Sequence, residues 1–325
     1  MEKFAYANPS TEKDALALLG TSWGDTAVLA GGTDLISSMK ELVATPKTVV
    51  NIKGIKSLGG ITAGKNGMRI GATVTLDELA ESAVVRKAFP SLTEAAMGVS
   101  SPQIRNMGTV GGDLLQRPRC WYYRNGFGLL ATQNGKALVP DGENKYHAII
   151  NNNGPAYFVS PSSLGPALIA LDATIRLHSA NGPRDIPAAK FFVAPLNEQS
   201  RETAIQPNEI LAEILIPTAP TANATYEVRQ KEALDWPLAT ASVALKMSGN
   251  QITSARVVLG HVAPTPFEAI AANQFLAGKT LTEQTADEAA KQAVMSATPL
   301  SQNSYKVQLA RVAVKRALLA TQKRA

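Results

Sequence analysis

The chain has 325 residues, 45% of them hydrophobic, which is too long for one small core and predicts two domains. Its 32 basic against 26 acidic side chains give a net charge of +6, which favours anionic ligands or acidic partners; no basic run interleaved with aromatic residues accompanies it, so we expect no nucleic-acid partner. Cys120 is the single cysteine, so the chain can form no internal disulfide and cannot hold an iron–sulfur cluster with its own cysteines.

The N-terminal part of the chain combines helices and strands with a glycine turn. Residues 11–20 predict a helix, with Ser10 offering a capping hydroxyl before it and acidic residues in its first turn. A strand at residues 27–29 runs directly into the turn Ala-Gly-Gly-Thr-Asp at 30–34, and a helix follows. Further elements expected here are strands at 48–52 and 68–72 and short helices after capping-box patterns at Thr75 and Ser91.

A second glycine-rich turn occupies residues 108–113, and we interpret the segment before it as sheet-like. Residues 116–154 then lack clear periodicity, and so long a stretch inside a compact domain is typical of a functional loop. The strand, turn, helix order repeats with a strand at 157–159, a turn at 160–163 and a helix at 167–171, and strands at 174–178 and 210–216 follow.

Residues 217–223 are the predicted domain boundary, because their prolines and small polar residues cannot continue regular structure. They divide the chain into a domain at 1–218, with subdomains at about 1–55 and 56–218, and a domain at 223–325. For the second domain we expect strands at 225–229, 239–247 and 252–259, then helices near 266–277, 285–297 and 302–321. Strands followed by helices favour an α+β arrangement over a wound βαβ series.

The two glycine turns predict a cradle for a diphosphate. Backbone N–H groups of such turns and of helix starts can hold a dinucleotide diphosphate without a cation, and glycine permits close approach or positive φ. Neither turn has the G-x-G-x-x-G pattern of a Rossmann site. The near-Walker sequence at 59–66 has Asn66 where a magnesium-binding Ser or Thr belongs, so we interpret it as a hairpin turn.

The residues around both turns resemble the FAD subunits of molybdenum hydroxylases, the xanthine dehydrogenase family that includes carbon monoxide dehydrogenase and bacterial aldehyde oxidoreductases. Residues 30–35 with Met39-Lys40 resemble the first pyrophosphate motif, and residues 103–113 resemble the second. Residues 160–163 are similar to a His-Pro-Ser-Asp turn of the family. Gly260, residues 263–266 and residues 304–306 resemble its C-terminal domain. The resemblance covers nearly the whole chain in order.

The resemblance implies a vanillyl-alcohol-oxidase-type FAD-binding domain of two α/β subdomains and a C-terminal domain with a three-stranded antiparallel sheet and helices. It implies that backbone in the two glycine motifs holds the pyrophosphate and ribityl chain, that other residues border the nucleotide, and that Leu211 and Lys231 lie near the flavin ring. The implied cofactor-binding residues are Leu29, Ala30, Gly31, Gly32, Thr33, Asp34, Leu35, Ala72, Ser101, Arg105, Gly108, Thr109, Gly111, Gly112, Asp113, Ser162, Ser163, Leu211 and Lys231.

The chain departs from the family's pattern at two places. Ser163 stands where the family commonly has an acid that contacts the nucleotide, which predicts weaker FAD binding unless Asp34 or Asp113 substitutes for it. The loop from residue 119 to 154 resembles an insertion that carries a four-iron, four-sulfur cluster in some relatives. Four thiolates are expected for such a cluster, so we expect the loop without it and interpret Cys120 as an inert core thiol.

The resemblance implies an electron-transfer role, active only in a complex. A large subunit would carry the molybdenum cofactor, a small subunit would carry two-iron, two-sulfur clusters, and this chain would pass electrons through FAD to an external acceptor such as NAD, oxygen or a quinone. We expect no catalytic side chain and no metal ligand here, since the three histidines have no ligand spacing and no hydrolase motif occurs. The alternatives are a stand-alone flavin reductase of the same superfamily and a flavin-free scaffold.

No stretch approaches the ~20 apolar residues of a membrane span, and the first residues lack the apolar core of a signal peptide. We therefore expect no membrane span and a cytoplasmic location. Export to the periplasm together with a signal-bearing partner is the alternative.

Overall fold

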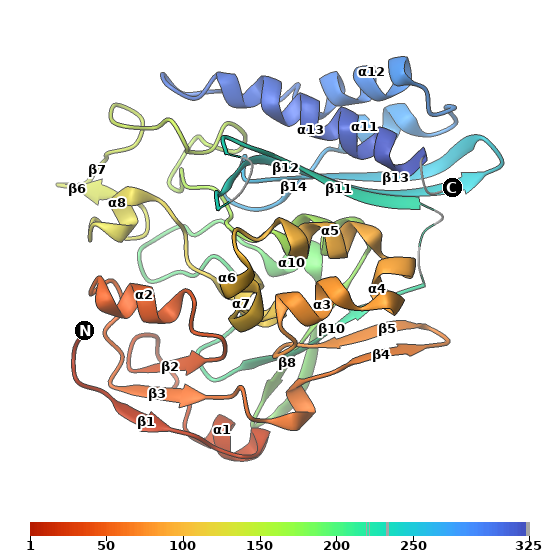
Figure 1. Cartoon of the computed structure of the whole chain (residues 1–325). Helices are drawn as coiled ribbons and strands as arrows, with labels where there is room; N and C mark the ends of the chain where they lie inside the picture. The colour runs from red at the N-terminus through yellow and green to blue at the C-terminus, as the bar shows by residue number, and fades with distance from the viewer. Residues whose placement is uncertain (219, 221, 232–233, 323–325) are drawn as a thin grey trace.

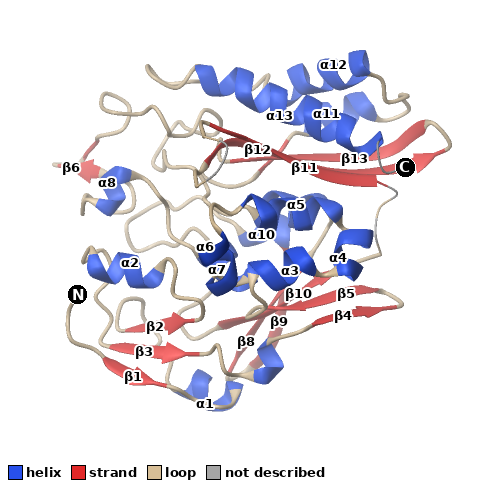
Figure 2. Ribbon diagram, viewed as in Figure 1, coloured by secondary structure: helices blue, strands red, loops and turns tan. Residues whose placement is uncertain are grey.

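The structure is a computed structural model that describes residues 1–218, 220, 222–231 and 234–322. A layer of helices lies between a group of strands that includes the first strands of the chain and a sheet of the C-terminal part, and further helices cover the outer face of this C-terminal sheet (Figures 1 and 2). The expected α+β class is confirmed. In the described part of the chain, no helix combines the length and apolar character needed to cross a bilayer.

A small parallel sheet begins the chain, with strands in the order β1-β3-β2. Val49 and Val50 of its central strand are buried, as expected for β-branched residues between two neighbours. Thr11, and not Ser10, caps the first helix, because the Thr11 hydroxyl accepts from the Asp14 N–H at 3.2 Å. The elements are β1 (Ala5–Ala7), α1 (Glu12–Ala17), β2 (Thr26–Leu29), α2 (Leu35–Lys40) and β3 (Thr48–Asn51).

A second, antiparallel sheet has its strands in the order β4-β5-β10-β8-β9. Gly64 pairs with Gly67, which leaves Lys65 and Asn66 at the tip of a hairpin and confirms that the near-Walker sequence is a turn. The central strand β10 is buried almost throughout, as its apolar sequence predicts. The strands are β4 (Ile61–Gly64), β5 (Gly67–Gly71), β8 (Thr174–Ser179), β9 (Gly182–Pro187) and β10 (Ile210–Ile216), and a short 3-10 helix, η1 (Lys56–Leu58), precedes them.

Short helices cover the inner face of this second sheet. The predicted capping box at Thr75 is confirmed, since Thr75 and Glu78 exchange both expected hydrogen bonds. The predicted box at Ser91 is wrong: Pro90 occupies the first helical turn and Phe89 is the cap, so Ser91 already lies inside the helix. These helices are α3 (Leu76–Glu81), α4 (Ala83–Ala88), α5 (Pro90–Gly98), α6 (Pro102–Met107), α7 (Val110–Leu115), α9 (Leu164–Ala170) and α10 (Ala188–Phe191).

The long segment at 116–154 holds only a short helix, α8 (Trp121–Arg124), and a hairpin of β6 (Thr132–Gln133) and β7 (Lys136–Ala137). The strand predicted at 157–159 does not form in this described region. The backbone of residues 157–160 makes only isolated hydrogen bonds: Tyr157 O accepts from Ala148 N at 2.9 Å, and Ser160 N–H donates to Ala263 O at 2.9 Å. These partners come from a loop and from the C-terminal part of the chain, so no ladder forms.

The C-terminal sheet has four antiparallel strands in the order β11-β12-β13-β14, so the expectation of three strands is wrong. The fourth strand is too short to give an alternating pattern. β11 starts at Ala222, inside the predicted linker, because residues 222–229 pair with β12 along their whole length. The elements are β11 (Ala222–Arg229), β12 (Pro237–Ser248), β13 (Gln251–Gly260), β14 (Phe267–Glu268), α11 (Ile270–Leu276), α12 (Glu283–Ala293) and α13 (Tyr305–Gln322).

Helix α13 packs across the outer face of this sheet. Its buried residues are mostly small, among them Ala310, Ala313 and Ala317, which lets the helix approach the strands closely. Valines and leucines of β12 and β13 complete this core, while the opposite face of β11 is turned toward α5 in the helical layer (Figure 1). The C-terminal sheet therefore packs on α5 and α9 of the helical layer.

Candidate functional site

The two glycine turns lie against one another. A Cβ on Gly31 would overlap the Met107 carbonyl oxygen and come within 2.9 Å of Gly108 Cα, so only glycine allows this contact. Gly32 has a φ of +77°, a left-handed conformation that favours glycine. In the described chain, none of the assigned hydrogen bonds uses the N–H groups of Gly31, Gly32 or Thr33 as a donor. The first turn thus offers free backbone donors next to the second.

The second glycine motif joins two helices, so the sheet-like segment expected before it is wrong. Gly108 ends α6, and the Thr109 hydroxyl caps α7 by accepting from the Gly112 N–H at 3.1 Å. Gly111 serves packing: its N–H donates to Ala72 O at 2.9 Å, and an added Cβ would meet the Ala72 Cβ at 3.0 Å. Gly111 therefore lets α7 pack against Ala72 at the end of β5, while Gly112 and Thr109 line the neighbouring cavity.

A cavity of about 50 Å³ lies where the motifs meet. The glycine motifs contribute Thr33, Asp34, Gly108, Thr109, Gly112 and Asp113 to its lining, with Ser163 beside them. The wall toward the C-terminal domain comes from Gly98, Val99, Ser100, Asp235, Trp236 and Pro237. Arg119 closes it from the loop side, with its guanidinium 4.6 Å from the centre of the Trp236 ring. The structure thus brings together segments that are far apart in the sequence.

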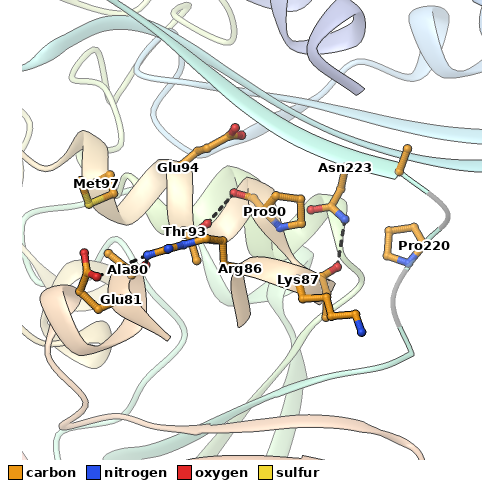
Figure 3. A pocket seen from close by; sticks show the side chains of 12 residues that line it. Ala80, Glu81, Arg86, Lys87, Pro90, Thr93, Glu94, Met97, Pro220 and Asn223 are labelled. Atoms are coloured by element: carbon orange, nitrogen blue, oxygen red, sulfur yellow. Dashed lines mark hydrogen bonds and ion pairs between the residues drawn. The ribbon is translucent and has the colours of Figure 1, made fainter. Parts of the chain in front are cut away.

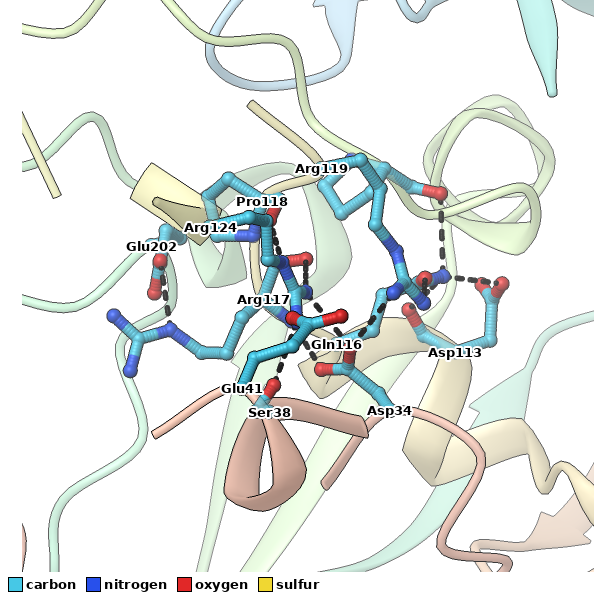
Figure 4. Close-up of polar contacts among 11 residues, drawn as sticks. Asp34, Ser38, Glu41, Asp113, Gln116, Arg117, Pro118, Arg119, Arg124 and Glu202 are labelled. Atoms are coloured by element: carbon cyan, nitrogen blue, oxygen red, sulfur yellow. Dashed lines mark hydrogen bonds and ion pairs between the residues drawn. The ribbon is translucent and has the colours of Figure 1, made fainter. Parts of the chain in front are cut away.

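Asp34 ties the first glycine motif to the loop that follows α7 (Figure 4). Its Oδ1 accepts from Arg124 Nη2 at 2.8 Å and lies 3.0 Å from Arg119 Nη1, while its Oδ2 accepts from the Arg117 N–H at 2.8 Å. Arg124 also donates to the Ser38 hydroxyl on α2 at 2.6 Å. The carboxylate therefore holds the loop against the turn and is fully engaged with protein donors.

Asp113 joins the second glycine motif to the start of α9. Its carboxylate accepts from the Ser162 hydroxyl at 2.5 Å and from the N–H groups of Ser163 and Leu164 at 3.2 and 3.0 Å. Gln116 Nε2 adds a contact at 3.0 Å. Burial raises the pKa of this carboxyl although these hydrogen bonds act to lower it. Because Asp113 caps α9 from outside, the helix begins at Leu164, earlier than its own sequence indicates.

Two models of protein families match the chain: "FAD binding domain in molybdopterin dehydrogenase" over residues 2–219, and "CO dehydrogenase flavoprotein C-terminal domain" over residues 224–321. The chain belongs to the family of FAD-binding medium subunits of molybdenum hydroxylases. It is an oxidoreductase subunit, its cofactor is FAD, and the family resemblance inferred from its glycine motifs is confirmed.

Relatives match along nearly the full length. The carbon monoxide dehydrogenase medium chain of Hydrogenophaga pseudoflava is 30% identical over 97% of this chain and 96% of that protein. The aldehyde oxidoreductase FAD-binding subunit PaoB of Escherichia coli is 28% identical over 96% of each. Among solved structures, reconstituted CO dehydrogenase from Oligotropha carboxidovorans superposes with a TM-score of 0.79 at 28% identity, over 100% of this chain and 99% of that one.

The other residues expected to bind the cofactor take different positions around the cavity. Ser101 caps α6, and Arg105 donates to Val99 O at 2.9 Å behind the cavity wall. Lys231 is exposed, and its N–H donates to Asp235 in the turn that carries Trp236. Leu211 is different: it is 2% exposed in the core of the second sheet and, in the described structure, is not among the lining residues. Leu29, Ala30, Leu35, Ala72 and Ser162 flank the lining at the ends of β2, β5, α2 and α9.

No local sequence pattern marks Arg119, Trp236 or Gly98 as residues of the cavity. Arg119 belongs to an irregular loop, and a Trp-Pro pair before a strand is not a signature of a cavity wall. Cys120 lies 3.2 Å from His147 Nε2, and burial raises the pKa of its thiol, which fits an unreactive side chain. The aromatic rings of residues 121 and 122 pack against His147. Among the described residues no group of His, Cys, Asp or Glu has the arrangement of a metal site.

A second, larger cavity of about 650 Å³ lies beside α5 (Figure 3). It is lined by residues of α3, α4 and α5 and by Pro220, Ala222 and Asn223 near the start of β11. Its arginine, Arg86, is held by the Ala80 carbonyl at 3.0 Å and by Glu81 at 3.4 Å. The glycine motifs do not reach it, so size does not make it the cofactor site.

Proposed function

We propose that this chain binds FAD between its two glycine motifs and relays electrons within a molybdenum-dependent hydroxylase or dehydrogenase. The electrons would come from a substrate oxidised at the molybdenum cofactor of a large partner subunit and pass through two-iron, two-sulfur clusters of a small partner subunit. From this chain they would go to an external acceptor. Bound FAD supplies the redox chemistry, and the chain's residues bind and orient it.

The contact between the two glycine motifs is the observation that supports this site. Gly31 is in contact with residues 107 and 108, and the N–H groups at 31–33 are free to meet roughly two negative charges of a diphosphate. Thr109 and Gly112 border the same cavity from the start of α7. In this proposal Asp34 and Asp113 shape the motifs from behind. Neither replaces the acid missing at Ser163, because both are engaged by protein donors.

The cavity of about 50 Å³ is smaller than a small-molecule site, which typically has ~300 Å³ or more. We propose that Arg119 and Trp236 move aside when FAD binds, since they close the cavity from the side of the loop and of the C-terminal domain. We also propose the other FAD contacts that the family resemblance implies, including those of Lys231 and Leu211.

The proposal further includes a domain division at residues 218 and 223 and a cytoplasmic location for the complex.

The proposal is tested by isolating the full-length chain from its own cells under native conditions and analysing what accompanies it. The expected preparation is yellow, contains about one FAD per copy of the chain, and includes partner chains that contain molybdenum and two-iron, two-sulfur clusters. A chain that carries FAD but purifies without metal-containing partners would contradict the relay role. Isolation of a colourless chain that takes up no FAD on incubation would contradict the cofactor site as well.

A further inference from the structure

A polar seam joins the FAD-binding part of the chain to the C-terminal sheet. Every second residue of a strand lies on the same face, and on β11 the residues of the face turned toward α5 are Asn223, Thr225 and Glu227. Asn223 Oδ1 accepts from Ser91 N at 2.9 Å, and Glu94 on α5 accepts from Thr225 N at 2.7 Å. We call this contact the α5–β11 seam. It runs along α5 from the larger cavity toward Gly98, which lines the cavity between the glycine motifs.

At the Gly98 end, the seam contains a buried carboxyl group with one free oxygen. The Glu227 side chain is 6% exposed. Its Oε2 accepts from Arg229 Nη2 at 2.5 Å and from Arg229 Nε at 3.2 Å, while its Oε1 is buried without a partner in the described structure. Arg229 Nη2 also donates to Gly98 O, and a Cβ on Gly98 would overlap Glu227. The pair therefore lies directly behind the cavity wall.

The charges around Glu227 make its protonation responsive to the cavity. Arg229 favours the ionised form, and the Asp113 carboxylate, which lines the cavity, opposes it. Thr240 lies opposite Glu227 on β12 and its hydroxyl pairs with His261, while Glu94 on α5 accepts from the Thr225 N–H, two residues along β11 from Glu227. Burial dominates and raises the pKa of Glu227 to about 7. The Glu227–Arg229 pair is thus neutral when Glu227 is ionised and carries one positive charge when Glu227 is protonated.

We propose that Glu227 takes up a proton when the anionic dinucleotide binds in the glycine cradle, which leaves Arg229 as a net positive charge behind the Gly98 wall. This rests on the proposed location of FAD. A negative charge about 10 Å away in a protein-like dielectric raises the pKa of a carboxyl by about one unit. Binding of the diphosphate therefore favours the protonated acid, and protonation in turn favours binding, because the two equilibria are linked.

The test is a calorimetric titration of FAD into flavin-free, full-length chain at pH 7.0, in PIPES and in Tris. These buffers differ in their enthalpy of ionisation, so the difference between the two heats counts the protons taken up. A pKa of Glu227 that rises by about one unit from about 7 predicts an uptake of about 0.4 proton per FAD, and a Kd that weakens about sixfold between pH 6.5 and pH 8.5. Glu227→Gln is expected to bind FAD with neither effect.

Glu94→Gln is the matched control, because it changes a carboxylate of the same seam that lies closer to the larger cavity; it should keep both the proton uptake and the pH dependence. If the native chain binds FAD without taking up protons, the inference is wrong although the FAD site stands. Uptake that persists in Glu227→Gln would also overturn it, since another group would then be responsible. If Gly31→Ala binds FAD as the native chain does, the proposed location itself fails, independently of Glu227.

Discussion

Replacing Gly31 with alanine tests the contact between the two glycine motifs. The added Cβ would overlap the Met107 carbonyl and lie 2.9 Å from Gly108 Cα. Both neighbours are backbone, so no flexible side chain can move aside and one motif must retreat from the other. Overpacking of this kind costs about 1–3 kcal/mol, which corresponds to roughly 5-fold to 150-fold in an equilibrium constant. Because the proposed site needs both motifs close together, FAD affinity is expected to drop by that factor.

The assay is a fluorescence titration of FAD into the flavin-free chain, with the Tm measured in parallel. Gly54→Ala is a matched control from the same part of the chain, because a Cβ there would meet nothing within 4 Å and Gly54 does not have a positive φ. We expect native affinity and Tm for Gly54→Ala and a clear loss of affinity for Gly31→Ala. An unchanged Tm in Gly31→Ala would refute the close packing of the motifs, and native affinity would refute the FAD site built on it.

Three further predictions concern Asp113, His261 and Arg119. Asp113→Ala leaves several donors without an acceptor and should lower the free energy of unfolding by about 2–4 kcal/mol, measured with urea; a loss under 1 kcal/mol would contradict its capping role. Burial lowers the pKa of His261 to about 3, so below about pH 6.5 the unfolded chain binds a proton that the folded chain excludes. At pH 5 this group should lower the free energy of unfolding by about 2 kcal/mol. Asparagine tolerates the positive φ of this position, and His261→Asn should lose less free energy of unfolding between pH 7 and pH 5. Arg119→Ala removes the stacking on Trp236 and should raise the stopped-flow rate of FAD association several-fold, whereas an unchanged rate would show that this pair does not close the cavity.

The buried histidine prediction depends on both ring nitrogens of His261. Nδ1 is paired with the Thr240 hydroxyl at 3.0 Å, whereas Nε2 is buried without a partner in the described structure. Lys306 adds to the effect, because its ammonium donates to the His261 carbonyl at 2.7 Å and disfavours a second positive charge nearby. A pH dependence of unfolding that is identical in the native chain and in His261→Asn would assign the effect to other groups.

The amino-acid sequence by itself determined the features that depend on neighbours along the chain. The first glycine turn, the Thr75 capping box and the hairpin at Lys65 and Asn66 follow from local backbone preferences, and the apolar run at 210–216 predicts its strand because a central strand is buried on both faces. The second glycine motif is different, because its residues from Val110 onward belong to helix α7. The order of the motifs along the chain also sufficed to indicate the family, which the matches over residues 2–219 and 224–321 confirm.

Only the tertiary structure decided which distant groups satisfy each other. Asp113 caps α9 from another segment, so the start of that helix could not be predicted from its own residues. β11 reaches back to Ala222 because β12 supplies its hydrogen-bond partners, although the local composition indicates a linker. Glu227 becomes a buried acid because α5 covers it at Gly98. Burial and long-range hydrogen bonds arise from contacts between segments far apart in the chain, and a local pattern of residue types does not encode them.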